Sequence, residues 1–87
     1  MRPVIVLGDS TSHGETVLEG ATATVVEGTP VAREGDRVSC PINGYGPCTI
    51  VSGDATTVIE GKAVARHGDQ CSCGATLIAS ITDTGML

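Results

Sequence analysis

The sequence predicts a small all-β protein in which short hairpins surround an approximate threefold axis, stapled by a metal ion near a narrow end. Three observations support this prediction: an internal repeat, short Val-, Ile- and Thr-rich runs between regularly placed glycines, and Cys and His residues at matching repeat positions. With 87 residues, the chain is expected to form one domain, 1–87, with a thin core. Such small scaffolds usually need a disulfide or metal staple.

The repeat is most evident in two segments, 20–40 and 53–73, which are identical at 12 of 21 positions when shifted by 33. The motif GDSTSH at 8–13 matches the ends of both copies, at 35–40 and 68–73, so the chain cycles about three times through one unit. Small pseudo-symmetric β units bury their faces against one another. This favours a compact tapering body, with a small irregular sandwich as the alternative.

The short apolar runs have the composition and length of strands. The expected strands are 4–7, 16–19, 22–27, 30–33, 49–51, 56–60, 63–66 and 75–80. Glu-Gly pairs at 27–28 and 60–61 separate two of these runs each time, which predicts tight hairpins with glycine at positive φ. A short helix at the C-terminus is left open.

Composition excludes several function classes. The net charge is −5 and the five basic residues are scattered, which argues against a nucleic-acid surface and against docking on anionic membranes. No apolar run is long enough for a spanning helix, and the N-terminus lacks the pattern of a classical signal peptide. If the protein leaves its cell, we expect it to do so without a classical signal.

The repeat aligns three residues that could bind a metal: His13, Cys40 and Cys73 each stand four positions after a Gly-Asp pair. Threefold symmetry would bring them together around the axis. Structural zinc takes four ligands from Cys and His, so we expect Zn²⁺ and a fourth ligand from elsewhere. Cys48 is the preferred fourth ligand because the Pro- and Gly-rich loop 40–48 can turn back on itself, and His67 and Cys71 are the alternatives.

Other readings of these residues are weaker. Four cysteines could form two disulfides, which suits a secreted protein with a signal peptide, and the closely spaced Cys71 and Cys73 do not form a CxxC redox motif. The Gly-Asp pairs contain Asp9, Asp36 and Asp69, and their repetition suits turns better than one acid–base site. No GxSxG motif is present, and a Cys-rich set is atypical of catalytic zinc, so we expect no enzyme.

The same residues resemble the PAAR-repeat family. The family motif appears in altered form at 30–33 (PVAR) and 63–66 (AVAR), each followed by a Gly-Asp turn, and GD…HG at 8–14, the loop at 40–48 and the tail at 73–80 also match. The likeness covers about residues 4–80. Family members often carry a His at the place of Tyr45 and bind zinc through a His-rich set, whereas this chain has only two His.

The resemblance implies a structural tip of the type VI secretion spike that caps and sharpens a trimeric VgrG-type spike, one copy per trimer, and helps to attach effectors. It implies assembly in the bacterial cytoplasm and export by the secretion apparatus into the medium or a target cell, whose membrane is pierced without stable insertion. No fused toxin domain is expected. A small zinc-binding adaptor that recruits a cargo or effector protein is the alternative function.

Overall fold

The computed structural model describes residues 3–39 and 48–80. These residues form no helix, hence none that could cross a membrane, and eight short strands: β1 (Ser10–Thr11), β2 (Val25–Val26), β3 (Thr29–Pro30), β4 (Arg37–Val38), β5 (Cys48–Thr49), β6 (Asp54–Ile59), β7 (Lys62–Val64) and β8 (Leu77–Ile78). The strands pair antiparallel as β1–β8, β2–β3, β4–β5 and β6–β7. The predicted all-β class is therefore confirmed.

The strands are shorter than the apolar runs suggested. Only β6 reaches six residues, and most strands contain two. The reason is that each run changes partner: Val17 forms an isolated bridge with Val38, and Ile50 forms one with Cys71. A single run thus contacts its own unit and the next one. The short C-terminal helix that the sequence left open would lie within 81–87, outside the described residues.

Both predicted Glu-Gly hairpins are present. Glu27 and Gly28 have φ of 50° and 80° between β2 and β3, and Glu60 and Gly61 have φ of 53° and 81° between β6 and β7. Positive φ at both central positions is the backbone of a type I′ turn, whose twist matches that of the flanking strands. Gly at the second position satisfies this without a Cβ penalty.

The three Gly-Asp turns are built alike. In each, the Asp N–H donates to the carbonyl three residues before it, at 3.0, 3.0 and 2.9 Å for Asp9, Asp36 and Asp69. Each carboxylate accepts in return the N–H of that earlier residue, at 2.9, 2.7 and 2.8 Å. The repeated aspartates are therefore turn-forming residues. The three turns define three repeat units, which are numbered along the chain: unit 1 (8–20), unit 2 (35–53) and unit 3 (68–80).

The symmetry extends to the centre of the molecule. The N–H of Ile5 donates to Ala65 at 2.9 Å, that of Ala65 to Ala32 at 3.0 Å, and that of Ala32 back to Ile5 at 2.7 Å. These three residues occupy matching positions just before the three Gly-Asp turns. A closed ring of three backbone bonds means that the units surround one axis, as the repeat predicted.

Two apolar clusters fill the interior. The larger draws on all three units and consists of Ile5, Val17, Ala32, Val38, Cys48, Ile50, Ala65, Cys71, Ala75, Leu77 and Ala79. The smaller draws on the two hairpins and the first segment and consists of Val4, Val6, Ala21, Val31, Ile59 and Val64. Most of these side chains are small, so much of the order must come from turns and polar contacts.

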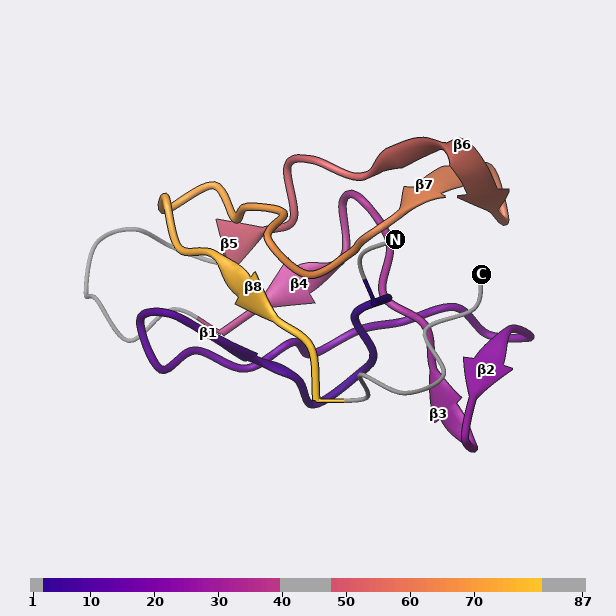
Figure 1. Cartoon of the computed structure of the whole chain (residues 1–87), viewed down its shortest axis with the longest axis horizontal. Helices are drawn as coiled ribbons and strands as arrows, with labels where there is room; N and C mark the ends of the chain where they lie inside the picture. Colours follow the sequence, from indigo (N-terminus) through magenta and orange to yellow (C-terminus); the bar gives the residue numbers. More distant parts are fainter. Residues whose placement is uncertain (1–2, 40–47, 81–87) are drawn as a thin grey trace.

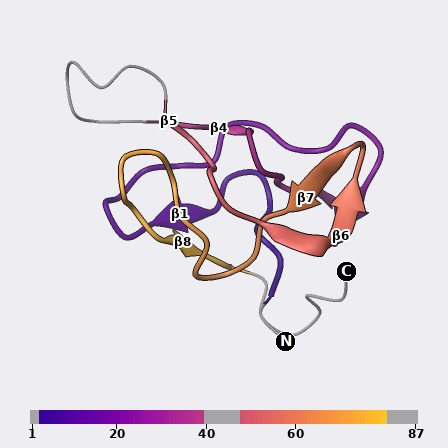
Figure 2. The same cartoon turned by 90° about the horizontal axis from the view of Figure 1, so that it is seen from above.

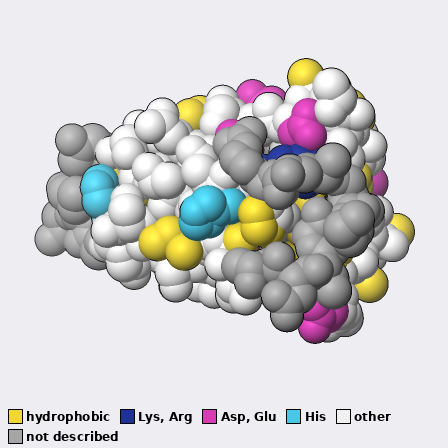
Figure 3. All heavy atoms as spheres, viewed as in Figure 1, with side chains coloured by type: hydrophobic (Ala, Val, Ile, Leu, Met, Phe, Trp, Pro, Cys, Tyr) yellow, Lys and Arg dark blue, Asp and Glu magenta, His cyan; other side chains and the backbone are white. Residues whose placement is uncertain are grey.

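The hairpins and the unit turns lie at opposite ends of the long axis. Figure 1 shows β2–β3 and β6–β7 at one end, called here the hairpin end, and the turns at 11–15 and 71–75 at the other, called the turn end. Figure 2 shows the same separation from above. The body narrows from the hairpin end toward the turn end (Figure 3), within extents of 35 × 25 × 21 Å.

Candidate metal centre

Two equivalent tight turns form the candidate site. Thr11 and Cys71 each donate a backbone N–H to the residue four positions later, Glu15 at 3.0 Å and Ala75 at 2.9 Å. The chain reverses at Gly14 and Gly74, where φ is 79° and 89°. Because unit 1 and unit 3 are adjacent around the axis, these turns lie side by side at the turn end (Figures 1 and 2).

Hydroxyl groups fix the spacing between the units. The Ser12 N–H donates to the Thr76 carbonyl at 2.8 Å, and the Thr76 N–H donates to the Ser12 hydroxyl at 3.0 Å. The same reciprocal pair recurs twice around the axis, as Ser39 with Thr16 and Ser72 with Thr49. Each unit is thus tied to its neighbour next to the ligand positions.

This geometry brings His13, Glu15 and Cys73 together: one ligand atom from each lies within 4.8 Å of the others. The Cys73 Sγ is 3.1 and 3.3 Å from the two Glu15 carboxylate oxygens. Glu15 is only 1 % exposed, Cys73 is half-buried and His13 is exposed. The group therefore joins two turns that are 58 residues apart along the chain.

The donor set suits a metal ion. Imidazole nitrogen, thiolate sulfur and carboxylate oxygen are the three ligand types that zinc takes in proteins. Burying a carboxylate is costly unless a positive charge or hydrogen bonds compensate it, and the contacts of Glu15 in the described structure are a hydroxyl and a thiol. A cation here would provide the missing compensation and would fasten unit 1 to unit 3.

The predicted ligands fall into three groups. The structure brings His13 and Cys73 together as their repeat positions suggested. Cys40 lies outside the described residues. Cys48 is buried in β5, within the larger apolar cluster, and does not belong to the group formed by His13 and Cys73.

The two alternative ligands lie elsewhere. Cys71 is buried in the larger apolar cluster, where burial, with the charges of Cys73 and Glu15, raises the pKa of its thiol to about 12. His67 is exposed, and its Nδ1 accepts the Ala79 N–H at 3.1 Å. No disulfide involves Cys71 or Cys73, so the described cysteines do not support the two-disulfide alternative.

Sequence reasoning missed Glu15. A signal for it exists once the units are aligned by their threonines: Thr16, Thr49 and Thr76 occupy one repeat position, so the residues before them, Glu15, Cys48 and Ala75, occupy another. The insertion at 40–48 hides this correspondence in the linear sequence. Glu15 and the predicted ligand Cys48 are thus the same position in two different units.

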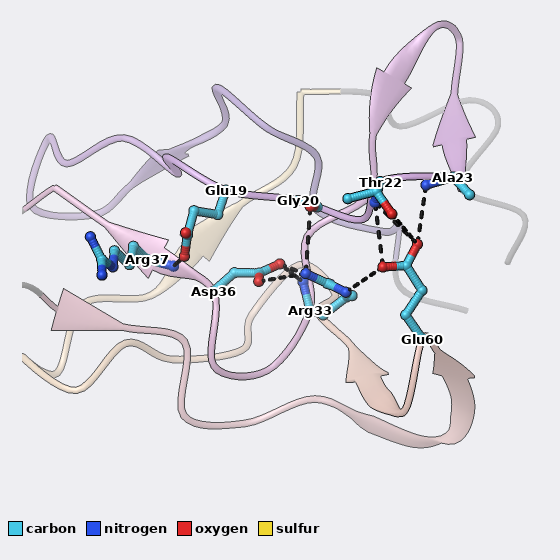
Figure 4. Close-up of polar contacts among 8 residues, drawn as sticks. All are labelled: Glu19, Gly20, Thr22, Ala23, Arg33, Asp36, Arg37 and Glu60. Atoms are coloured by element: carbon cyan, nitrogen blue, oxygen red, sulfur yellow. Dashed lines mark hydrogen bonds and ion pairs between the residues drawn. The ribbon is translucent and has the colours of Figure 1, made fainter.

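Ion pairs of two arginines stabilise the hairpin end. Arg33 is paired with Asp36 at 3.0 Å and with Glu60 at 2.8 Å, and the Glu60 carboxylate also accepts the N–H groups of Thr22 and Ala23 (Figure 4). The hydrogen bond and the charge of Asp36 raise the pKa of Arg33 above the usual value for arginine. Arg66, the equivalent arginine, pairs with Asp54 at 2.8 Å. Both arginines are the last residue of a copy of the altered family motif, and both fasten a hairpin to the body.

Comparison with known proteins agrees with this architecture. The model of the PAAR motif matches residues 7–79, which includes both hairpins, the first two repeat units and all but the last residue of the third. No curated protein matches the sequence significantly. PAAR-motif proteins are structural components associated with the type VI secretion spike and are exported by that system. With a match over most of its length, this chain belongs to the PAAR-motif family.

Proposed function

We propose that the chain is the tip of a type VI secretion spike, which caps and sharpens the blunt end of a trimeric VgrG-type protein as one copy per trimer. The threefold arrangement of backbone hydrogen bonds, in a chain of the PAAR-motif family, carries this proposal. Three similar units can each meet one of three identical spike chains. The protein then acts by shape and rigidity, without catalysis, and offers effectors a place of attachment.

The exposed apolar residues support a threefold partner. Leu18, Val51 and Ile78 occupy one repeat position in the three units and are 53, 49 and 42 % exposed. Val25 and Val58 occupy another, on the two hairpins, and are 53 and 59 % exposed. Large apolar side chains left in solvent at matching positions suit contacts that repeat around the axis.

We assign docking on the trimeric spike to the hairpin end. Apolar and acidic side chains both lie on the surface there (Figure 3), and short strands offer backbone edges to a β-helical partner. The candidate metal group lies at the other end, so the narrow turn end would point toward the target membrane (Figure 1). In this proposal the chain assembles with the spike in the bacterial cytoplasm. The secretion apparatus then exports it into the medium or a target cell.

The proposed metal is a single structural Zn²⁺. His13 and Cys73 are two of its ligands, and Cys40 is proposed as the third because it occupies the same repeat position in unit 2. Cys48 is the fourth ligand that the sequence analysis preferred. When bound, the ion supplies a rigid cross-link where too few residues remain for an apolar core.

Mass measurement of the purified complex tests the function. Mixing the chain with a VgrG-type spike trimer from the same genome should give one copy per three spike chains. Val58→Arg or Val25→Arg should weaken the complex, whereas Gln70→Arg, an exposed change away from the hairpins, should not. A complex with three copies per trimer, or no association, would refute the cap and favour the adaptor that recruits a cargo protein.

A further inference from the structure

We propose that Glu15 is a metal ligand and that Thr11 holds its carboxylate in place. This inference rests on the structural metal in the function proposed above and changes the identity of one ligand. The fourth ligand would be the Glu15 carboxylate of unit 1 in place of Cys48, which occupies the same repeat position in unit 2. The site would then combine nitrogen, sulfur and oxygen donors.

The placement of Glu15 is the first argument. Its carboxylate oxygens are 3.1 and 3.3 Å from the Cys73 Sγ, and it shares a 4.8 Å group with His13. A carboxylate and a thiol this close, with an imidazole in the same group, offer oxygen, sulfur and nitrogen donors that one zinc ion can take together. Ala75, the equivalent residue of unit 3, offers no donor, and Cys48 is outside this group.

Burial is the second argument. Glu15 is 1 % exposed and forms no ion pair within the described residues. A carboxylate in this position loses its hydration at a large energetic cost, which a cation would compensate. The other buried acids, Asp9, Asp36 and Asp69, have their own backbone N–H partners in the Gly-Asp turns. Among these four buried acids, Glu15 is the one whose carboxylate accepts no backbone N–H within the described residues.

Thr11 supplies the third argument. Its hydroxyl donates to Glu15 Oε1 at 3.1 Å and accepts the N–H groups of His13 and Glu15, each at 3.1 Å. A hydroxyl has one donor and two acceptor sites, so Thr11 is fully used. It fixes the backbone that carries His13 and the rotamer of Glu15 together. Outer-shell partners of this kind orient the ligands of metal sites.

The decisive experiment compares Glu15→Gln with Cys48→Ser, two changes at the same repeat position. Zinc affinity is measured by competition with a chromophoric chelator, and Co²⁺ is used as a spectroscopic probe of the bound site. Gln keeps the size of Glu15 and the acceptor for Thr11 but loses the charge. Glu15→Gln should weaken zinc binding more than about 100-fold, beyond the effect usual for outer-shell changes. Cys48→Ser should change it less than about threefold.

The cobalt spectrum separates a lost ligand from a lost fold. In Glu15→Gln the visible d–d bands of four-coordinate Co²⁺ should shift or weaken, while the near-ultraviolet thiolate-to-cobalt band of Cys73 persists. Thr11→Val should weaken zinc binding about 10- to 100-fold, and Thr11→Ser should restore it. Far-ultraviolet circular dichroism of each variant reports whether the fold is retained.

Three results would overturn parts of this assignment in distinguishable ways. Normal zinc affinity and an unchanged cobalt spectrum in Glu15→Gln would exclude Glu15 as a ligand while leaving the metal in place. Loss of zinc in Cys48→Ser, with Glu15→Gln unaffected, would return the position to Cys48. Absence of metal from the unmodified protein would refute the metal of the proposed function itself.

Discussion

The two ends of the molecule solve the same problem, a scarcity of apolar residues, in different ways. At the hairpin end, ion pairs join Arg33 to Asp36 and Glu60, and Arg66 to Asp54. At the turn end, hydroxyl–backbone pairs align the units, and His13, Glu15 and Cys73 converge without any Arg or Lys among their contacts in the described structure. The side-chain cations of the chain therefore hold one end of this thin core, and the proposed metal ion would hold the other.

Removing the metal should be the largest perturbation and should act first on the turn end. Metal-binding free energy in small domains is also folding free energy, on the order of 10 kcal/mol for zinc-finger peptides. A chelator should lower the melting temperature strongly, as read by calorimetry, and zinc should restore it. A melting temperature unaffected by chelation would remove the contrast between the two ends.

The neighbouring cysteines sharpen this test. Cys73→Ser should destabilise the zinc-loaded protein more than Cys71→Ser, because it removes a proposed ligand. In the metal-free protein the order should reverse, since Cys71 is 2 % exposed in the apolar cluster and a serine hydroxyl would be buried there without solvation. Equal melting temperatures in both states would show that Cys73 is not a ligand.

Several features of the fold could be predicted from the sequence because each depends on local chemistry. Gly-Asp pairs and Glu-Gly pairs specify turns by backbone conformation alone, and their repetition revealed the three units. The convergence of His13 and Cys73 followed from the same repeat. Symmetry turned a sequence period into a spatial arrangement.

Three features could not be predicted. Apolar runs indicate extended backbone but do not say that Val17 or Ile50 pairs with a residue of the next unit, so the strands appeared longer than they are. Glu15 was missed because its proximity to Cys73 arises between units that are 58 residues apart. Glu60 similarly looked like a simple turn residue, yet it contacts Thr22, Ala23 and Arg33.

Breaking the ion pairs should be the next largest effect and should act on the hairpin end. Arg33→Met leaves the buried Asp36, which is 2 % exposed, without its guanidinium partner and removes the ion pair of Glu60. The expected cost is about 3 kcal/mol of unfolding free energy, measured by urea titration of the zinc-loaded protein. The side chain of Arg37 is exposed, so the control variant Arg37→Met should lower the unfolding free energy by less than about 0.5 kcal/mol.

This substitution also tests whether the ends are independent. Zinc affinity of Arg33→Met should be unchanged while its binding to the spike trimer falls, because the hairpin end loses one of its ion-pair centres. Weakened zinc binding in Arg33→Met would mean that the two ends are energetically coupled and that the comparison drawn above is wrong.

The smallest expected effect concerns the pH dependence of the hairpin end. The Thr56 hydroxyl, which donates to Asp54 at 2.5 Å, and the Arg66 guanidinium at 2.8 Å hold the pKa of Asp54 well below its usual value. An Asp whose pKa is lower in the folded state contributes stability above its unfolded pKa of about 3.9, and this contribution is lost as the pH falls toward the folded value. Asp54→Asn should therefore be less stable than the unmodified protein at neutral pH, and the difference should shrink between about pH 5 and about pH 2. Both proteins lose any metal over this range, so the difference between their urea midpoints isolates Asp54. A difference that stays constant with pH would show that Asp54 acts through packing and not through its charge.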